Sequence, residues 1–319
     1  MKKIGIVGCG AVTQISYSKV LRLFPDVEVV AVCDTNLDNA TKVANIFNAS
    51  IQLYEDLLEL VDIVIIATPP SSHFALVSAA LKKNLTVICE KPFVGTEKEA
   101  NGLIELALKY DNSRLYVAHF RRNYPSAELA KEIVTSGILG KIKKITAFEG
   151  GRFSWKTQSG YVFNDPFGGV LFDTGSHTID MALYAANLDS LDLKVELINF
   201  NKDKEEPAHE IDANLVLKVI TENAIDFHVK LSRRIVLANK IKIIGENGFV
   251  EFPTDLSNVV RLGTEAHSTI VYASHKYDTL MDCFAVQFKY MFSDKLDEKF
   301  TANKFINLTK IMEGISNAK

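Results

Sequence analysis

The sequence has 319 residues, and a prior of about 150 residues per domain predicts two domains. With 47% hydrophobic and 24% charged residues it has the composition of an ordinary globular protein, which argues against a disordered, collagen-like or disulfide-built chain. The 36 basic and 39 acidic residues give a net charge of −3, so no electrostatic footprint of a nucleic-acid or membrane-surface partner is present.

The apolar runs are too short to cross a bilayer. Val61–Ala67 is interrupted by Asp62 and falls far below the roughly 20 residues that a membrane span needs. The N-terminal Met1–Gly10 is too short and too rich in glycine for a signal peptide, so we predict a first strand there. The four cysteines are widely spaced, which is typical of reduced thiols. We therefore expect a cytoplasmic protein with no membrane segment, no nucleic-acid partner and no metal site.

Residues 1–120 alternate apolar strands with amphipathic helical stretches such as Asn36–Phe47. Strands are predicted at Lys3–Val7, Val27–Cys33, Val61–Ala67, Thr86–Cys89 and Leu115–Ala118. Because these strands are continuously apolar, both faces of their sheet should be covered by helices. The pattern predicts an α/β domain with a parallel, doubly wound sheet.

Residues 121–319 have a different pattern. Ile225–Leu231 and much of Asn214–Val219 alternate apolar and polar residues, which is typical of an antiparallel sheet with one solvated or partner-facing side. Further strands are predicted at Lys141–Phe148, Leu193–Phe200, Lys240–Ile244, Phe249–Phe252 and Thr269–Ala273, and helices at Ser126–Ser136, Thr174–Ala186, Thr279–Phe292 and Ala302–Ile315. Asn201–Pro207 is predicted to be a solvated hairpin loop.

The alternating strands also bear on self-association. Leu215, Leu217 and Val219 lie on one face of their strand, and Val216 lies with Lys218 on the other. Since both faces carry apolar side chains, we expect a homo-oligomer, a dimer or a tetramer.

A glycine-rich turn follows the first predicted strand. Gly8-Cys-Gly10-Ala11-Val12-Thr13 opens a helical stretch, and Asp34 ends the next strand. Glycines permit the tight turn, and the following helix N-terminus attracts a pyrophosphate, so the order strand, turn, helix, strand and acidic residue indicates a dinucleotide site. Thr13 stands where the fingerprint has its third glycine, and an ordinary strand-to-helix turn is the alternative.

Asp34 also indicates which dinucleotide is bound. A carboxylate at this place can accept hydrogen bonds from the adenosine ribose hydroxyls and would repel a 2′-phosphate, and no arginine follows it in Thr35-Asn36-Leu37. We therefore expect NAD, with NADP less favoured.

Two later segments complete a family pattern. Thr68-Pro-Pro-Ser-Ser-His73 and Cys89-Glu-Lys-Pro92 follow strands of the parallel sheet, where ligands bind. Farther on, Gly168-Gly-Val-Leu-Phe-Asp173-Thr-Gly-Ser-His177 leads into an apolar helix. With the first turn and the stretch Ser232–Gly248, these motifs resemble the Gfo/Idh/MocA oxidoreductases over essentially the whole chain.

The resemblance implies an NAD(P)-binding Rossmann domain, residues 1–120, followed by a substrate-binding and oligomerisation domain, residues 121–319, with an open, mainly antiparallel sheet. It further implies hydride transfer between nicotinamide and a carbinol or carbonyl carbon of a sugar, sugar derivative or cyclitol. The matching catalytic positions are Lys91, Asp173 and His177. A solvated lysine, a helix N-cap and a helix histidine are the respective alternatives, and a metal site that adds Asp180 is disfavoured because it lacks the His and Cys content of zinc sites.

The chemistry suits these residue types. A hydride leaves a carbinol carbon as the hydroxyl proton is removed, so a histidine, which titrates near neutrality, fits the acid/base role of His177. The Lys91 ammonium would stabilise developing alkoxide charge, and Asp173 would orient the histidine or a substrate hydroxyl.

The predicted site residues fall into overlapping groups. The cofactor-binding group is Gly8, Gly10, Ala11, Val12, Asp34, Thr68, Pro69, His73, Glu90 and Lys91. The substrate-binding group is Lys91, Arg122, Trp155, Asn164, Asp173 and His177, with Arg121, Arg152 and Tyr161 as further candidates.

Two other functions stay open at this point. One is a regulatory or assembly protein that binds NAD without turnover, which the joint presence of Lys91, Asp173 and His177 argues against. The other is an enzyme that oxidises its substrate transiently with retained NAD to epimerise it or to cleave a glycoside.

Overall fold

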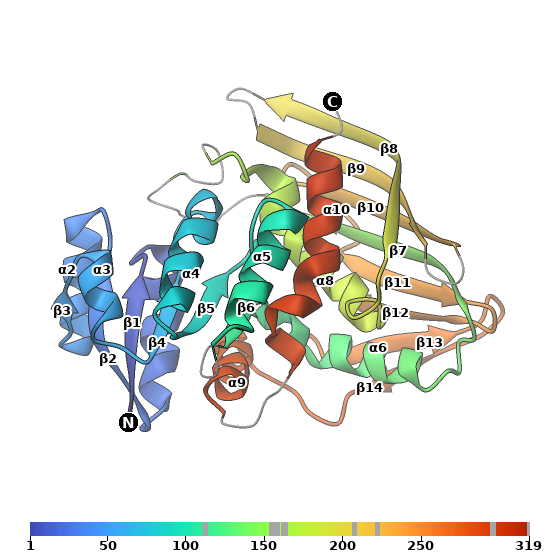
Figure 1. The fold of residues 1–319 in the computed structure, drawn as a ribbon. Coiled ribbons are helices and arrows are strands. Elements are labelled where there is room, and N and C mark those ends of the chain that lie inside the picture. The colour runs from blue at the N-terminus through green and yellow to red at the C-terminus, as the bar shows by residue number, and fades with distance from the viewer. Residues whose placement is uncertain are drawn as a thin grey trace. The chain divides into compact units, whose positions relative to one another are not determined.

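The fold is seen in a computed structural model (Figure 1) that describes residues 1–110, 114–152, 160, 165–205, 209–220, 224–293 and 298–317. Of the strand residues 202–205 and 209–217 only the backbone is described. The chain divides into two compact units. The first contains Met1–His119 and Phe284–Lys304, and the second contains the described parts of Phe120–Ser154, Val162–Cys283 and Phe305–Lys319.

The first unit is built on a parallel sheet. Its strands are β1 (Lys2–Val7), β2 (Val27–Cys33), β3 (Ser50–Ile51), β4 (Ile63–Ile66), β5 (Thr86–Glu90) and β6 (Leu115–Ala118). They are ordered β3-β2-β1-β4-β5-β6, and every pairing is parallel. This is the doubly wound order of Rossmann domains, in which the crevice between β1 and β4 is the expected ligand position. The predicted parallel sheet is confirmed.

Helices connect these strands. They are η1 (Thr13–Tyr17), α1 (Ser18–Val20), η2 (Leu21–Leu23), α2 (Leu37–Phe47), α3 (Tyr54–Leu58), η3 (Pro70–Ser72), α4 (His73–Lys82) and α5 (Glu97–Ala107). Local sequence explains two of the starts. The Asn36 side chain accepts a hydrogen bond from the Asn39 amide at the head of α2, and Thr96 and Glu99 form a reciprocal capping box at α5. The four residues of β4 are all buried, as expected for a strand covered on both faces.

A C-terminal segment belongs to this first unit. It comprises α9 (Leu280–Phe292) from Phe284 onward, with η6 (Glu298–Phe300) and most of η7 (Ala302–Phe305). The rings of Phe284 and Phe288 lie 5.9 and 5.0 Å from that of Tyr17. The Lys2 ammonium donates to the Phe292 carbonyl at 2.9 Å. The sequence prediction placed residues 284–304 in the second domain, and it was wrong there because a helical pattern does not reveal which sheet a helix packs on.

The second unit is built on a mixed sheet. Its strands are β7 (Ile142–Gly150), β8 (Lys194–Glu205), β9 (His209–Ile220), β10 (Ala224–Ser232), β11 (Lys240–Gly245), β12 (Phe249–Pro253), β13 (Val259–Gly263) and β14 (Ser268–Tyr272). The order is β14-β13-β12-β11-β7-β10-β9-β8, and among the described strands only β7 and β10 pair in parallel. The prediction of a mainly antiparallel sheet is confirmed. Asn201–Glu205, predicted as loop, continues β8, because cross-strand pairing with β9 outweighs its polar composition.

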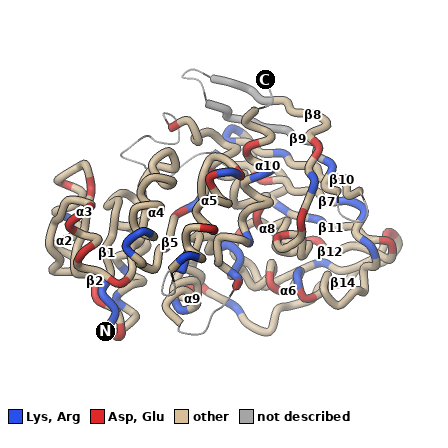
Figure 2. Tube along the Cα trace, in the orientation of Figure 1, with Lys and Arg blue, Asp and Glu red and all other residues tan. Residues whose placement is uncertain are grey.

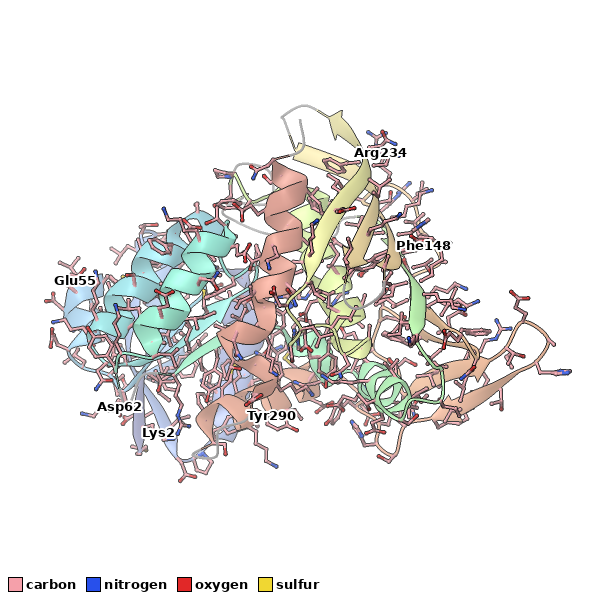
Figure 3. All side chains as sticks on the ribbon, turned by 45° about the vertical axis from the view of Figure 1, so that its right-hand side comes forward. Lys2, Glu55, Asp62, Phe148, Arg234 and Tyr290 are labelled. Carbon is pink, nitrogen blue, oxygen red and sulfur yellow. The ribbon has the colours of Figure 1, made fainter. Side chains whose placement is uncertain are left out.

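Helices cover one face of this sheet. They are η4 (Phe120–Asn123), α6 (Pro125–Thr135), η5 (Leu171–Gly175), α8 (Ser176–Ala185) and α10 (Ile306–Ser316). All ten residues of α8 are buried, and Ala147, Phe227 and Val229 are buried beneath the helices. The alternate residues face the other way, and Phe148 projects on the side opposite the helices (Figure 3).

Charges of both signs are interspersed along both units (Figure 2). Among the described residues, no helix is long and apolar enough to span a membrane.

Candidate active site

The glycine-rich turn leaves β1 at the carboxyl edge of the first sheet. Gly8 has a φ of +96°, and a Cβ placed there would lie 2.4 Å from the Ala67 carbonyl oxygen, so no other residue fits without displacing the strand beside it. At Gly10 the same construction meets nothing within 4 Å, which leaves open space beside the backbone. The Thr13 hydroxyl donates to the Gly8 carbonyl at 2.7 Å, so the residue that replaces the third glycine holds the turn. A tight turn with open backbone fits a dinucleotide pyrophosphate.

Asp34 lies against this turn from the end of β2. Its Oδ2 accepts the Cys9 amide at 2.6 Å and its Oδ1 accepts the Asn36 amide at 2.7 Å. Because each carboxylate oxygen can accept about two hydrogen bonds, both oxygens keep capacity for the ribose hydroxyls of a dinucleotide.

Gly10, Ala11, Val12, Thr68 and Pro69 retain exposed surface at the same sheet edge. His73 does not, since it is fully buried. Its Nε2 lies 3.0 Å from the Thr68 carbonyl oxygen, and its Nδ1 lies 3.0 Å from those of Pro92 and Phe93. His73 therefore fastens the loop after β4 to the loop after β5. We predicted a direct contact between His73 and the cofactor, whereas the structure shows His73 buried and in contact with the two loops.

Glu90 is the last residue of β5 and Lys91 follows it, and both are half-buried. The Tyr17 hydroxyl donates to Glu90 Oε1, and the Lys91 amide donates to Glu90 Oε2 at 3.0 Å. Burial raises the pKa of Glu90, while the hydrogen bond from Tyr17 and the charge of Lys91 oppose that rise. Burial also raises the pKa of Tyr17 well above its usual value, so Tyr17 stays a donor.

Asp173 and His177 lie four residues apart where η5 leads into a buried helix of the second unit. Asp173 lies in η5 and His177 in the first turn of α8. Between them Gly175 lets the chain approach β10, since a Cβ there would lie 2.7 Å from Leu231 Cδ1. The Phe120 ring lies 5.4 Å from that of His177, edge-on.

Arg233, directly after β10, holds Asp173. Its Nη2 donates to Asp173 Oδ2 at 2.8 Å and to the Gly169 carbonyl at 3.0 Å. The Arg233 side chain is 6% exposed and that of Asp173 is 21% exposed, so the ion pair is largely shielded from water. Gly169 has a φ of +84°, which favours glycine where the carbonyl turns toward Arg233.

A second cation lies close by. Arg121 Nη1 donates to both Glu149 oxygens at 2.9 Å, and the Thr178 hydroxyl donates to Glu149 Oε2. Burial would lower the pKa of Arg121, but the charges of Glu149 and Asp173 raise it above the usual value. Glu149 thus connects the start of α8 to β7. The charge of Asp173 interacts with two guanidinium groups, those of Arg233 and Arg121.

The substrate-binding prediction for Arg122 was wrong. The side chain is 0% exposed, and its guanidinium donates to Asp180 at 2.6 to 3.1 Å and to Asp189 at 3.0 Å. The guanidinium carbon also lies 4.0 Å from the centre of the Phe305 ring. All of these contacts place Arg122 in a buried ion-pair network.

Asp180, the residue considered for a metal site, belongs to the same network. Within the described part of the chain, no cluster of three metal-ligating side chains occurs.

The other substrate candidates are placed as follows. Trp155, Tyr161 and Asn164 lie outside the described residues, and Arg152 is exposed.

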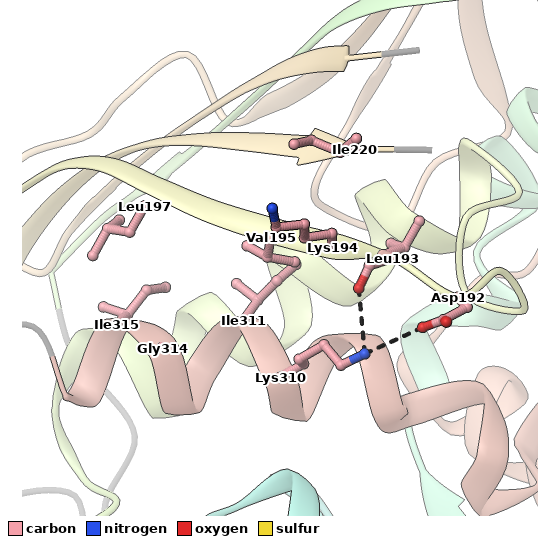
Figure 4. A pocket seen from close by; sticks show the side chains of 10 residues that line it. All are labelled: Asp192, Leu193, Lys194, Val195, Leu197, Ile220, Lys310, Ile311, Gly314 and Ile315. Atoms are coloured by element: carbon pink, nitrogen blue, oxygen red, sulfur yellow. Dashed lines mark hydrogen bonds and ion pairs between the residues drawn. The ribbon is translucent and has the colours of Figure 1, made fainter. Parts of the chain in front are cut away.

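A pocket of about 550 Å³ lies between α10 and β8 (Figure 4). Its lining includes Val195, Ile311 and Ile315, and also Lys310, whose ammonium donates a hydrogen bond to Asp192. It shares no residue with the predicted site.

The sequence analysis did not single out three residues that contact the candidate site residues or their neighbours: Arg233, Glu149 and Tyr17. Arg233 and Glu149 lie at strand ends, and a charged residue directly after the alternating run Ile225–Leu231 is a signal that could have found Arg233. Tyr17 gave no signal, because a tyrosine in a helical stretch is ordinary core.

The comparisons with known proteins agree with the fold. The family described as "Oxidoreductase family, NAD-binding Rossmann fold" matches residues 2–119, and the "GFO/IDH/MocA C-terminal domain" matches residues 127–251. Inositol 2-dehydrogenase of Serratia proteamaculans is 25% identical over 93% of this chain and 87% of its own. D-glucoside 3-dehydrogenase of Escherichia coli is 30% identical over 57% of this chain and 53% of its own.

Among solved structures, a 3-ketoreductase from Actinomadura kijaniata in complex with NADP and TDP-benzene has a TM-score of 0.79 at 17% identity, covering 98% of this chain and 96% of its own. That likeness concerns the fold alone. The two family matches cover the whole parallel sheet and most of the second sheet, and the chain belongs to the Gfo/Idh/MocA family of oxidoreductases.

Proposed function

We propose that the protein transfers a hydride between a nicotinamide dinucleotide and a carbinol or carbonyl carbon of a sugar, sugar derivative or cyclitol. The observation that carries this proposal is the pair Asp173 and His177 at the start of α8, with Asp173 held by Arg233 at 2.8 Å. The names of the inositol and glucoside dehydrogenases among the relatives support a polyol as substrate.

The division of labour follows from the surroundings of each group. When bound, the nicotinamide ring supplies the hydride acceptor or donor. His177 takes the proton from the substrate hydroxyl oxygen during oxidation and returns it during reduction. A guanidinium 2.8 Å from Asp173 favours the ionised carboxylate, so Asp173 accepts hydrogen bonds and does not serve as the acid. The Lys91 ammonium stabilises negative charge on the reacting oxygen.

The cofactor is proposed to be NAD, with NADP less favoured. Asp34 supports this choice because its Oδ2 contacts the turn at the Cys9 amide and both of its oxygens retain capacity for ribose hydroxyls, whereas a 2′-phosphate would meet a like charge. Because one solved structure of similar fold contains NADP, the choice is tested by comparing the affinities of the protein for NAD and NADP in a titration.

Three further expectations belong to the same proposal. The substrate contacts predicted for Trp155 and Asn164 stay predictions, as does a cytoplasmic location. A dimer or tetramer is also proposed, supported by the outward-facing side chains of the second sheet, such as Phe148.

The test is a panel of inositols and glucosides incubated with the purified protein and NAD, while the absorbance of reduced nicotinamide is followed. His177→Ala is expected to lower turnover by at least about 10²-fold, the usual size of a lost general acid or base. NAD affinity should stay nearly unchanged, because the dinucleotide turn and Asp34 lie in the first unit.

The matched control is His267→Ala, which removes an exposed histidine of the second unit. Its turnover should equal that of the unmodified protein. If His177→Ala also retains full turnover, the acid/base assignment is wrong. If the protein converts substrate while its tightly held NAD shows no net reduction, transient oxidation replaces simple dehydrogenation.

A further inference from the structure

Tyr17 stands out among the buried titratable groups because it is tied to the loop that carries Lys91. It is 0% exposed, and its hydroxyl donates to Glu90 Oε1. The other oxygen of the same carboxylate accepts the Lys91 amide at 3.0 Å. The half-buried Glu90 carboxylate thus connects Tyr17, in the first helical segment, to the proposed catalytic lysine.

The ring of Tyr17 is fixed independently of its hydroxyl. Phe284 and Phe288 contact it edge-on, with ring centres 5.9 and 5.0 Å away, and both come from α9. Edge-to-face contacts of this kind restrict the orientation of an aromatic ring. The hydroxyl is therefore presented to Glu90 in a preset position.

Glu90 needs this donor. Burial raises the pKa of its carboxyl, and the Tyr17 hydrogen bond, the Lys91 charge and the Lys91 amide each favour the ionised form. The titratable groups that interact with its charge include Tyr17, Lys91 and the buried thiol of Cys89. Without the hydroxyl, the carboxylate loses one of the groups that favour its ionised form.

We propose that Tyr17 is a positioning residue for Lys91: its hydroxyl holds the Glu90 carboxylate ionised and fixed, and that carboxylate anchors the Lys91 backbone and favours the protonated Lys91 side chain. The catalytic part of this role rests on the proposed function of Lys91. The physical part does not, because attraction between a carboxylate and an ammonium exists whether or not turnover occurs.

The experiment measures the proton on Lys91 directly. The full-length protein is treated with trace acetic anhydride over a range of pH, and acetylation of Lys91 is quantified by mass spectrometry. Only the deprotonated amine reacts, so the pH midpoint of labelling reports the Lys91 proton. Glu90→Gln is expected to lower the midpoint by about one pH unit, which is about tenfold faster labelling at neutral pH.

Tyr17→Phe keeps the ring against Phe284 and Phe288 and removes only the hydroxyl. It is expected to increase labelling at neutral pH by a smaller factor than Glu90→Gln, with rates that converge on those of the unmodified protein at high pH. The matched control is Tyr54→Phe, because the Tyr54 hydroxyl lies in the same unit and donates to the Leu76 carbonyl instead of to Glu90.

A merely structural role predicts a different pattern. Loosening of the loop would change the labelling rate by one factor at every pH and leave the midpoint in place, and that result would overturn the proposal, as would unchanged labelling in both variants. If Tyr17→Phe does not fold, Glu90→Gln still tests the link from the carboxylate to Lys91, and an unshifted midpoint in that variant overturns the proposal.

The outcomes separate this inference from the proposed function. A shifted midpoint together with full turnover in Lys91→Met would retain the Tyr17 to Lys91 linkage and reject the catalytic role of Lys91. An unshifted midpoint together with lost turnover in Lys91→Met, but not in Lys98→Met on the exposed surface of α5, would do the reverse.

Discussion

Replacing Arg122 by methionine should destabilise the protein by several kcal/mol. The substitution removes the cation from between two carboxylates whose side chains are 1% and 2% exposed, those of Asp180 and Asp189. Asp180 loses contacts of 2.6, 2.9 and 3.1 Å, whereas Asp189 keeps Lys131 at 3.8 Å. Breaking a buried pair by removing one partner costs about 3–5 kcal/mol, so Asp180 should account for most of the loss.

The loss should depend on pH with a definite sign. Burial raises the pKa of the Asp180 carboxyl, and Arg122 opposes that rise. Without Arg122 the folded-state pKa rises further above the unfolded value, so the ionised group opposes folding at high pH and the penalty shrinks as the carboxyl protonates. The deficit of Arg122→Met should therefore be smaller at pH 5 than at pH 8.

Thermal unfolding of the full-length protein at the two pH values measures both effects. A decrease in Tm on the order of 10 °C is expected at pH 8, given about 2–4 °C per kcal/mol for a chain of this size. Lys131→Met serves as control, since its ammonium is 27% exposed and more distant, and it should cost less than about 1 kcal/mol. An unchanged Tm, or an equal loss at both pH values, would refute the buried-charge reasoning.

Three further predictions concern the cofactor and the assembly. Gly8→Ala would bring a Cβ to within 2.4 Å of the Ala67 carbonyl oxygen at a φ of +96°. The affinity for NAD, measured by fluorescence, should therefore fall at least about tenfold. Gly102→Ala, where a Cβ meets nothing within 4 Å, should leave that affinity unchanged. Asp34→Ser should shift the NADP to NAD affinity ratio toward NADP by about tenfold or more, and an unshifted ratio would remove Asp34 from the specificity argument. Light scattering should give a mass above that of one chain, and a single-chain mass at micromolar concentration would reject the oligomer.

Much of the first unit could be predicted because its signals are local. Gly8 and the acidic end of β2 are read from neighbouring residues, and the apolar β4 requires cover on both faces. The place of residues 284–304 could not be predicted, because the contact of Phe288 with Tyr17 joins parts of the chain far apart in sequence.

The motifs named the candidate residues of the site, but they did not show which side chains hold those residues in place. The spacing of four residues placed Asp173 and His177 near one helical face, and in the structure Asp173 lies in η5 and His177 in the first turn of α8. Their catalytic roles stay predictions. Arg122 and Arg233 are both arginines near motifs, and only the fold shows that the first is sealed among Asp180 and Asp189 while the second reaches Asp173. Sequence cannot tell a buried arginine from one in a binding site, because burial depends on how distant elements pack.

Transfer of deuterium tests the central claim most directly. The protein is incubated with NAD and an inositol or glucoside deuterated at its carbinol carbons, and the reduced cofactor is analysed by mass spectrometry. The account predicts one deuterium per reduced nicotinamide, with the rate lowered at least about 10²-fold in His177→Ala and unchanged in His267→Ala. Turnover of a polyol with no deuterium in the cofactor, in free or in protein-bound form, would contradict it.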